Sequence, residues 1–130
     1  MIPLPLDATD EQILDVVRLW VDHLVHERYG EALRVVEARD HWTSDILETV
    51  IRNYGSIDPM YDASAWKVTP LESASGGPTP RHDLDRCDDG RAFIYFDLPL
   101  NGEWSDVTAT FDVVPEDDGL HIVLDEVYVM

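Results

Sequence analysis

The sequence is poor in cysteine and contains no long apolar run. Its single cysteine, Cys87, excludes a disulfide framework within the chain and a cysteine-based zinc finger. No stretch approaches the roughly 20 apolar residues that a membrane-spanning helix needs. Residues 1–12 also lack the basic start and the apolar core of a signal peptide. We therefore expect a cytoplasmic protein without a membrane segment.

Basic residues are scarce as well. The 130 residues include 27 Asp and Glu against 9 Lys and Arg, which is a formal charge of −18. Lys67 is the only lysine beside eight arginines, a bias that favours a bacterial, high-GC coding sequence. A chain this negative is repelled by phosphate at long range. We therefore expect it to bind neither nucleic acid nor an anionic membrane.

The acidic residues are unevenly distributed along the chain. Residues 1–65, 66–91 and 92–130 carry formal charges of −8, −1 and −9. The last segment contains nine acidic residues and no basic one. Such an imbalance either serves solubility, as acidic composition does in some microbial proteomes, or presents a surface to a basic partner.

Length and composition predict a single domain over residues 1–130. Hydrophobic residues make up 45% of the chain and aromatic residues 9%. That content is enough for a buried core and too high for a disordered acidic tail. Within this domain the first half of the chain has a helical period and the second half the period of strands.

Three helices are predicted in the first half. Thr9 and Gln12 have the spacing of a capping box, which predicts the start of a helix over residues 10–27. A short second helix is expected over residues 31–38, and a third from Thr43 or Ser44 to Gly55. The apolar stripe of the first helix, at a period of 3.6 residues, consists of Ile13, Val16, Val17, Trp20, Val21 and Leu24.

Four strands are predicted in the second half, over residues 65–71, 92–98, 104–114 and 120–130. Asn101-Gly102 is a typical hairpin turn, and residues 116–119 form the next turn. Residues 72–90 are expected to be one long loop. The clearest alternation places one set of side chains on a single face: Val107, Ala109, Phe111 and Val113.

Helices followed by an antiparallel meander predict an α+β fold. Two to three N-terminal helices would pack on a curved antiparallel sheet of about four strands. This order of elements resembles the NTF2-like, or cystatin-like, family, in which a curved sheet wraps a long helix as a cone. The resemblance covers most of the chain through element order and length, and no residue motif supports it. A two-layer α+β sandwich is the alternative.

No pattern of metal or nucleophile chemistry is complete. His23 and His26 share a helical face, but no third ligand follows at a suitable spacing. Cys87 lies among acidic residues, which disfavour a reactive thiolate. The acidic residues of the predicted loop depart from the calcium-loop template and indicate a solvated segment: Asp83, Asp85, Asp88 and Asp89. We expect no catalytic residue, no metal and no cofactor.

The NTF2-like resemblance implies a pocket between the helices and the concave sheet, where some family members carry out acid–base chemistry. The candidate pocket residues are Tyr29, Tyr54, Tyr61, Trp66, Asp97 and Asp112. Under this alternative the chain is a small-ligand binder or an acid–base enzyme. Tyrosine and tryptophan at helix ends more often pack their rings in the core, with their polar atoms in contact with water, than line a catalytic pocket. The sequence therefore favours a binding protein over an enzyme.

The chain also resembles in type the small acidic immunity proteins of bacterial polymorphic toxin systems, through its size, its acidity and its α+β pattern. This resemblance implies an antitoxin that inhibits a basic toxin domain, with opposed charges steering the association. The predicted partner-binding residues are Asp97, Glu103, Trp104, Asp106, Asp112, Glu116, Asp117, Asp118, Glu126 and Tyr128. Repulsion between acidic sheets predicts a monomer or a weak homodimer.

Overall fold

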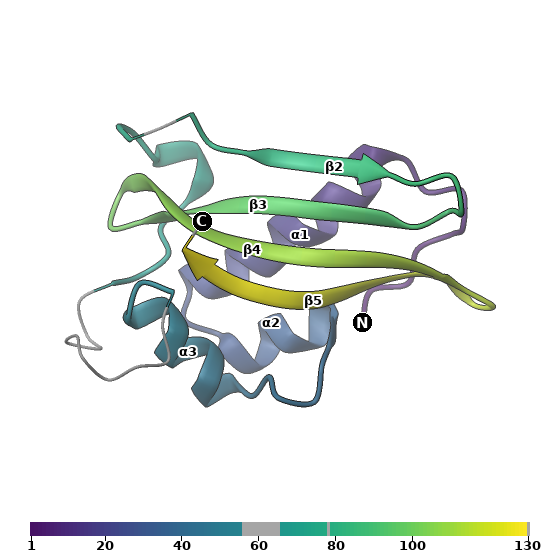
Figure 1. Ribbon diagram of the computed structural model, residues 1–130. Helices are drawn as coiled ribbons and strands as arrows, with labels where there is room; N and C mark the ends of the chain where they lie inside the picture. The colour runs from purple at the N-terminus through teal and green to yellow at the C-terminus, as the bar shows by residue number, and fades with distance from the viewer. Residues whose placement is uncertain (56–65, 78, 130) are drawn as a thin grey trace.

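In the described part of the chain, a five-stranded sheet carries three helices on one side (Figure 1). The computed structural model describes residues 1–55, 66–77 and 79–129. The helices are α1 (Asp10–Val25), α2 (Tyr29–Val35) and α3 (Ser44–Arg52). The strands are β1 (Glu37–Ala38), β2 (His82–Arg86), β3 (Ala92–Leu100), β4 (Glu103–Glu116) and β5 (Gly119–Val129), and a single 3-10 turn covers Leu71–Ser73.

The sheet is mixed, with the strand order β1-β5-β4-β3-β2. Strands β2 to β5 form an antiparallel meander, whereas the short β1 runs parallel to β5. The predicted α+β class with N-terminal helices is confirmed. The sheet has five described strands rather than about four.

The core lies between α1 and the centre of the sheet, behind β3 and β4 in Figure 1. The whole predicted stripe of α1 is buried. Trp20 packs edge-on against Phe111 of β4, with ring centroids 5.1 Å apart. Trp20 and Phe96 have no exposed surface, and Phe111 is 1% exposed. Large side chains therefore fill the space between this helix and the sheet.

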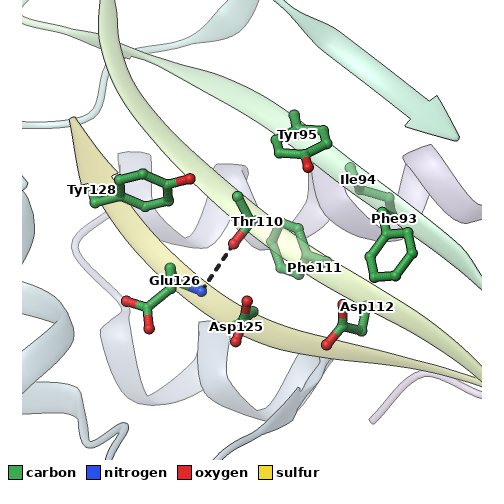
Figure 2. Close-up of a pocket in the computed structure, with 9 residues that line it drawn as sticks. All are labelled: Phe93, Ile94, Tyr95, Thr110, Phe111, Asp112, Asp125, Glu126 and Tyr128. Carbon is green, nitrogen blue, oxygen red and sulfur yellow. Dashed lines mark hydrogen bonds between the residues drawn. The ribbon is translucent and has the colours of Figure 1, made fainter. Parts of the chain in front are cut away.

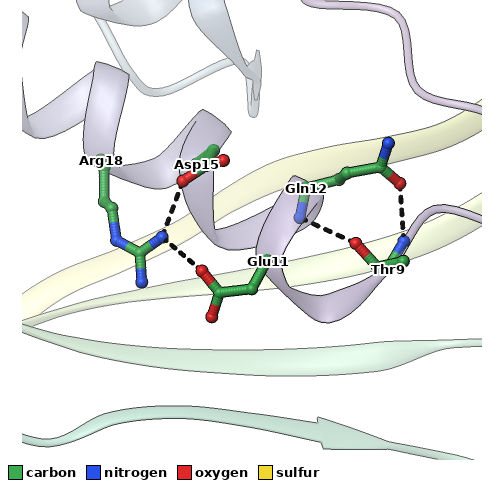
Figure 3. A network of polar contacts seen from close by, with 5 residues as sticks. All are labelled: Thr9, Glu11, Gln12, Asp15 and Arg18. Atoms are coloured by element: carbon green, nitrogen blue, oxygen red, sulfur yellow. Dashed lines mark hydrogen bonds and ion pairs between the residues drawn. The ribbon is translucent and has the colours of Figure 1, made fainter.

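The start of α1 is held by side chains, as Figure 3 shows. Gln12 donates its backbone N–H to Thr9 Oγ1 at 3.2 Å, and Thr9 donates its own N–H to Gln12 Oε1 at 2.8 Å. The predicted capping box is therefore confirmed. Arg18 pairs with Asp15 and Glu11 farther along the same exposed side. The helix ends at Val25, before the predicted residue 27, and Glu27 adopts a left-handed φ of 57°.

Two turns align the long strands. Asn101 and Gly102 have φ angles of 52° and 85°, the paired positive values of a type I′ hairpin, so the predicted turn between β3 and β4 is confirmed. Gly119 follows the turn between β4 and β5. A Cβ atom at Gly119 would collide with the carbonyl oxygen of Leu4, which accepts a hydrogen bond from Leu120. Glycine is therefore needed where the N-terminal segment pairs with the start of β5.

Several predicted boundaries are corrected. The predicted loop over residues 72–90 is wrong for residues 82–86, which pair with β3 as β2. Asp83 and Asp85 therefore lie on a strand, where an edge position tolerates charge because only one neighbour covers it. Val68 makes an isolated bridge to Leu100 instead of belonging to a strand over residues 65–71, of which residue 65 lies outside the described residues. The second helix begins and ends earlier than the predicted 31–38. Within the described ranges, no helix is long and apolar enough to cross a membrane.

Candidate functional site

The described helices cover one face of the sheet and leave the other uncovered. Along β3, Ile94 and Phe96 are buried in the core, whereas Phe93 and Tyr95, which alternate with them, point to the opposite side. We call this opposite side the open face. Around the middle of the three central strands this face includes Phe93, Tyr95, Asp97, Thr108, Thr110, Asp112, Asp125, Glu126 and Tyr128.

A hollow of about 560 Å³ lies in the open face (Figure 2). The exposed ring of Phe93 and the partly exposed rings of Tyr95 and Tyr128 reach it from β3 and β5, and carboxylates reach it from β4 and β5. It is lined by Phe93, Ile94, Tyr95, Thr110, Phe111, Asp112, Asp125, Glu126 and Tyr128. Large aromatic side chains are enriched at surfaces that bind proteins, and charged groups at the rim of such surfaces steer the association.

A β-bulge explains why two consecutive acidic residues both line the hollow. The pairing of β4 with β5 joins Thr110 to Glu126 and Phe111 to Leu124, and so it skips Asp125. In a regular strand, neighbours point to opposite faces, but a bulge places two residues opposite one. Thr110 Oγ1 accepts the backbone N–H of Glu126 at 3.1 Å. The indole of Trp42 donates to the Asp125 carbonyl oxygen at 3.0 Å, which fixes the bulge from the far side of β5.

Two arginines from other parts of the chain contact residues of the hollow. Arg39, directly after β1, places Nη2 2.6 Å from Asp112 Oδ2 and Nε 3.3 Å from Asp125 Oδ1. Arg81, directly before β2, has its guanidinium carbon 5.0 Å from the centroid of the Tyr95 ring. The open face thus already binds guanidinium groups in two ways, through a pair of carboxylates and through an aromatic ring.

The carboxylate of Glu126 differs from those beside it. Within the described part of the chain it has no hydrogen bond or ion pair, although its backbone N–H is bonded. Five of the nine acidic residues in segment 92–130 have a side-chain partner: Asp97, Asp106, Asp112, Asp118 and Asp125. The four whose carboxylates have none among the described residues are Glu103, Glu116, Asp117 and Glu126, and of these only Glu126 lines the hollow.

The ten predicted partner-binding residues are not brought together at one place. Asp112, Glu126 and Tyr128 line the hollow. Glu116, Asp117 and Asp118 lie at the turn between β4 and β5, where His121 pairs with Asp118 at 2.7 Å. Glu103 and Trp104 lie at the other end of β4, and Asp106 accepts a hydrogen bond from the Tyr54 hydroxyl at 2.6 Å.

Asp97 and Trp104 have contacts that hold the sheet together. Asp97 is 8% exposed, and its carboxylate accepts hydrogen bonds from the Thr108 hydroxyl at 2.7 Å and the Arg81 N–H at 2.8 Å. The Trp104 ring packs against His82, which stacks on Phe96 with centroids 3.9 Å apart. Burial in this stack lowers the pKa of His82. Asp97 is therefore already occupied within the fold.

The six residues of the alternative pocket are also separated. Tyr29 is buried near Arg52, and burial raises the pKa of its hydroxyl. The rings of Tyr54 and Trp66 lie 4.8 Å apart. Asp97 and Asp112 belong to the open face, on the side of the sheet away from α1, whereas Tyr29 lies among the core residues. Tyr61 lies outside the described residues.

The two histidines predicted to share a helical face differ in their surroundings. Nδ1 of His23 is buried and has no hydrogen-bond partner among the described residues. No group of three or more His, Cys, Asp or Glu side chains in the described residues is arranged to hold a metal ion. His26 Nδ1 lies 2.9 Å from the carbonyl oxygen of Asp22, at the end of α1. Cys87 is exposed at the surface.

Sequence reasoning did not find Phe93, Tyr95, Thr110, Asp125 and Arg39 as site residues. Residues 93–96 are apolar throughout, so their alternation between two faces leaves no trace in the sequence. The bulge did leave a signal, because two acidic residues stand in succession between the buried Leu124 and Val127. Arg39 and Asp112 are 73 residues apart, and no local pattern connects them.

Comparisons with known proteins do not assign a family. No protein-family model, no curated protein and no solved structure matches the chain. The function is therefore inferred from the chemistry of the open face.

Proposed function

We propose that the protein is a binding module that holds a basic partner protein on its open face, in the manner of an immunity or antitoxin-type inhibitor. The observation that carries this proposal is the hollow, where exposed aromatic rings and carboxylates lie together on a sheet face that the described helices leave uncovered. A cytoplasmic location and a bacterial origin belong to the same proposal.

The distribution of charge supports a basic partner. Strands β3, β4 and β5 all belong to residues 92–130, the segment with a formal charge of −9. Opposite charges accelerate the encounter of two proteins and disfavour wrong partners. This long-range attraction needs no particular arrangement of the acidic residues, so the turn between β4 and β5 contributes to it as well as the hollow does.

The aromatic residues add the short-range part of the interaction. Phe93 is 42% exposed, and Tyr95 and Tyr128 are partly exposed around the same hollow. Aromatic side chains at the centre of an interface contribute most of its free energy, while charged groups at the rim mainly set the rate of association. The hollow thus combines aromatic rings and carboxylates on one surface.

A toxin domain with a basic surface is the class of partner that we favour. A domain that acts on nucleic acid or on nucleotides exposes Arg and Lys side chains that bind phosphate. An acidic protein face complements those side chains and excludes the phosphates from them. The binding module would therefore inhibit such a domain by occupying its substrate surface.

The pocket alternative has less support from the structure. It requires space between the helices and the sheet, but Trp20, Phe96 and Phe111 fill that region with almost no exposed surface. Its described candidate residues lie on different sides of the sheet. The proposal of a binding module therefore stands ahead of a ligand-binding or enzymatic pocket.

Co-expression tests the proposal. The product of the adjacent open reading frame is expressed alone, with this protein, and with a variant in which Glu126→Lys and Tyr128→Ala alter the hollow. We expect the adjacent product to be toxic, the unaltered protein to relieve the toxicity, and the variant to fail. The matched control, Asp117→Lys, has the same change of charge as Glu126→Lys but lies in the turn between β4 and β5. The proposal is contradicted if the product of the adjacent open reading frame is not toxic, or if co-expression does not relieve its toxicity.

A further inference from the structure

We infer that the hollow accepts an arginine side chain of the partner, with Glu126 bound to its guanidinium group and the rings of Tyr95 and Tyr128 beside it. This inference rests on the proposed function, because it specifies the chemistry by which the open face would bind a basic protein. In this inference, the contact between Glu126 and the arginine contributes more to binding than the overall negative charge of the protein does.

The arginines of the chain itself show what this surface binds. Arg39 lies between Asp112 and Asp125 with contacts of 2.6 Å and 3.3 Å, and Arg81 lies over the ring of Tyr95. Both kinds of contact suit a planar guanidinium group, which forms parallel hydrogen bonds with carboxylates and stacks on aromatic rings. One more guanidinium group would therefore find the same two kinds of neighbour in the hollow.

Glu126 is the group in the hollow that can receive it. Its carboxylate is exposed and has no partner among the described residues, whereas Asp112 and Asp125 are already paired with Arg39. The backbone of Glu126 is held by Thr110 Oγ1, so the carboxylate starts from a fixed strand position and not from a mobile loop. Tyr128 lines the hollow two residues farther along β5 (Figure 2).

The chemistry favours arginine over lysine. An ammonium group is compact and strongly hydrated, so it gains less from lying between aromatic rings. A guanidinium group is more weakly hydrated, presents two N–H groups to one carboxylate and stacks its plane on a ring. Among the described residues, the hollow offers the unpaired carboxylate of Glu126 beside partly exposed tyrosines. This environment distinguishes arginine from lysine.

Three short peptides test the inference. Each has the sequence acetyl-Gly-X-Gly-X-Gly-amide, where X is arginine, lysine or the uncharged citrulline. They are titrated into the ¹⁵N-labelled protein in low salt while amide chemical shifts are recorded. We expect the arginine peptide to shift Tyr95, Thr110, Glu126 and Tyr128 and to bind about fivefold more tightly than the lysine peptide, and we expect no binding of the citrulline peptide.

Two variants of equal charge separate a specific contact from general attraction. Glu126→Gln should weaken the arginine peptide about tenfold, because it removes a charge-assisted pair of hydrogen bonds. Asp117→Asn removes the same charge from the turn between β4 and β5 and should change the affinity less than about twofold. Both residues are exposed, so neither change should affect folding.

The outcomes distinguish this inference from the proposed function. Equal binding of the lysine and arginine peptides on the open face overturns the arginine preference and leaves the acidic binding face intact. Equal effects of Glu126→Gln and Asp117→Asn overturn the role of Glu126 in the same way. Shifts confined to the turn between β4 and β5, with none around the hollow, overturn both the inference and the choice of the open face.

Discussion

The two faces of the sheet come from the same strands but differ in chemistry. On the helix side, Ile94, Phe96 and Phe111 are at most 1% exposed and contact other apolar side chains. On the open face, Phe93, a direct neighbour of Ile94 in the chain, is 42% exposed. Strand alternation thus assigns one residue to stability and the next to a surface that can bind. The difference shows that segment 92–130 presents two surfaces of different chemistry, one in the core and one toward solvent.

Two histidines show the same difference between the core side of the sheet and its acidic surroundings. His82 lies against Phe96, where burial lowers its pKa. His121, on β5 and pointing away from the core, has its pKa raised mainly by the hydrogen bond to Asp118, with Glu37 contributing. An apolar surrounding disfavours the imidazolium ion and an acidic one favours it. The two sides of the sheet therefore shift the pKa of a histidine side chain in opposite directions.

The largest expected effect compares two aromatic residues on the two faces. Phe111→Ala should lower the free energy of unfolding by about 3–5 kcal/mol, because it removes the ring that packs against Trp20. Tyr128→Ala, on the open face, should lower it by less than about 1 kcal/mol, because that ring is partly exposed. Urea unfolding followed by circular dichroism measures both values. Similar losses for the two variants would show that the open face belongs to the core.

The next effect concerns the bulge. Thr110→Val keeps the shape of the side chain but removes the oxygen that accepts the Glu126 N–H, so it should cost about 1 kcal/mol. It should also shift the amide resonances of Asp125 and Glu126. Thr110→Ser, which retains the hydroxyl, is the control and should leave the Glu126 amide close to its original position. Unchanged amide resonances of Asp125 and Glu126 in Thr110→Val would contradict the conclusion that Thr110 holds the bulge in place.

A smaller effect is expected at the ion pairs that connect β1 to the open face. Arg39→Ala should lower the free energy of unfolding by up to about 1 kcal/mol in low salt and by less in 0.5 M salt, because the guanidinium is partly exposed. Arg34→Ala removes the same charge from a more exposed site, 3.7 Å from Glu31, and should have almost no effect. Equal losses for the two variants would show that only net charge matters.

The smallest effect is the pH dependence that the two histidines impose. The pKa of His121 is raised, so its stabilising contribution is complete below about pH 6.5, the ordinary value, and is lost as the pH rises through the folded value. The pKa of His82 is lowered, so stability is retained above about pH 6.5 and is lost as the pH falls toward the folded value.

Unfolding free energies measured from pH 5 to 8.5 test these opposite signs. His121→Gln should reduce stability at pH 6 more than at pH 8.5. His82→Gln should flatten the loss of stability on the acidic side, although it also lowers stability at every pH because the stack on Phe96 is disturbed. Parallel curves for His121→Gln and the unaltered protein would contradict the stabilising pair with Asp118.

Local signals made much of the fold predictable from the sequence. The stripe of α1, the capping box at Thr9 and the turn at Asn101-Gly102 each depend on residues within a few positions, and all three are confirmed. Strand β2 was not predicted, because its alternating charges resemble a loop and only pairing with β3 makes it a strand. Strand β1 has two residues, too few to show a period.

The site was predictable only in part, because it depends on contacts between distant segments. Asp112, Glu126 and Tyr128 were found as acidic or aromatic residues in predicted strands. Asp97 has the same sequence character, yet Thr108 and Arg81 hold its carboxylate, and no local pattern indicates this. Arg39 reaches the open face from β1 and neutralises part of a segment that contains no base of its own.

The bulge in β5 behaves as the insertion of one residue that leaves the alternation of the other side chains between the two faces unchanged. If Asp125 were deleted, Leu124, Glu126, Val127 and Tyr128 would follow in regular alternation, and each would keep its present side of the sheet. The strand can therefore gain or lose one carboxylate without transferring a core residue to solvent. The charge of the hollow can therefore change by a single codon while the core residues of β5 keep their side of the sheet.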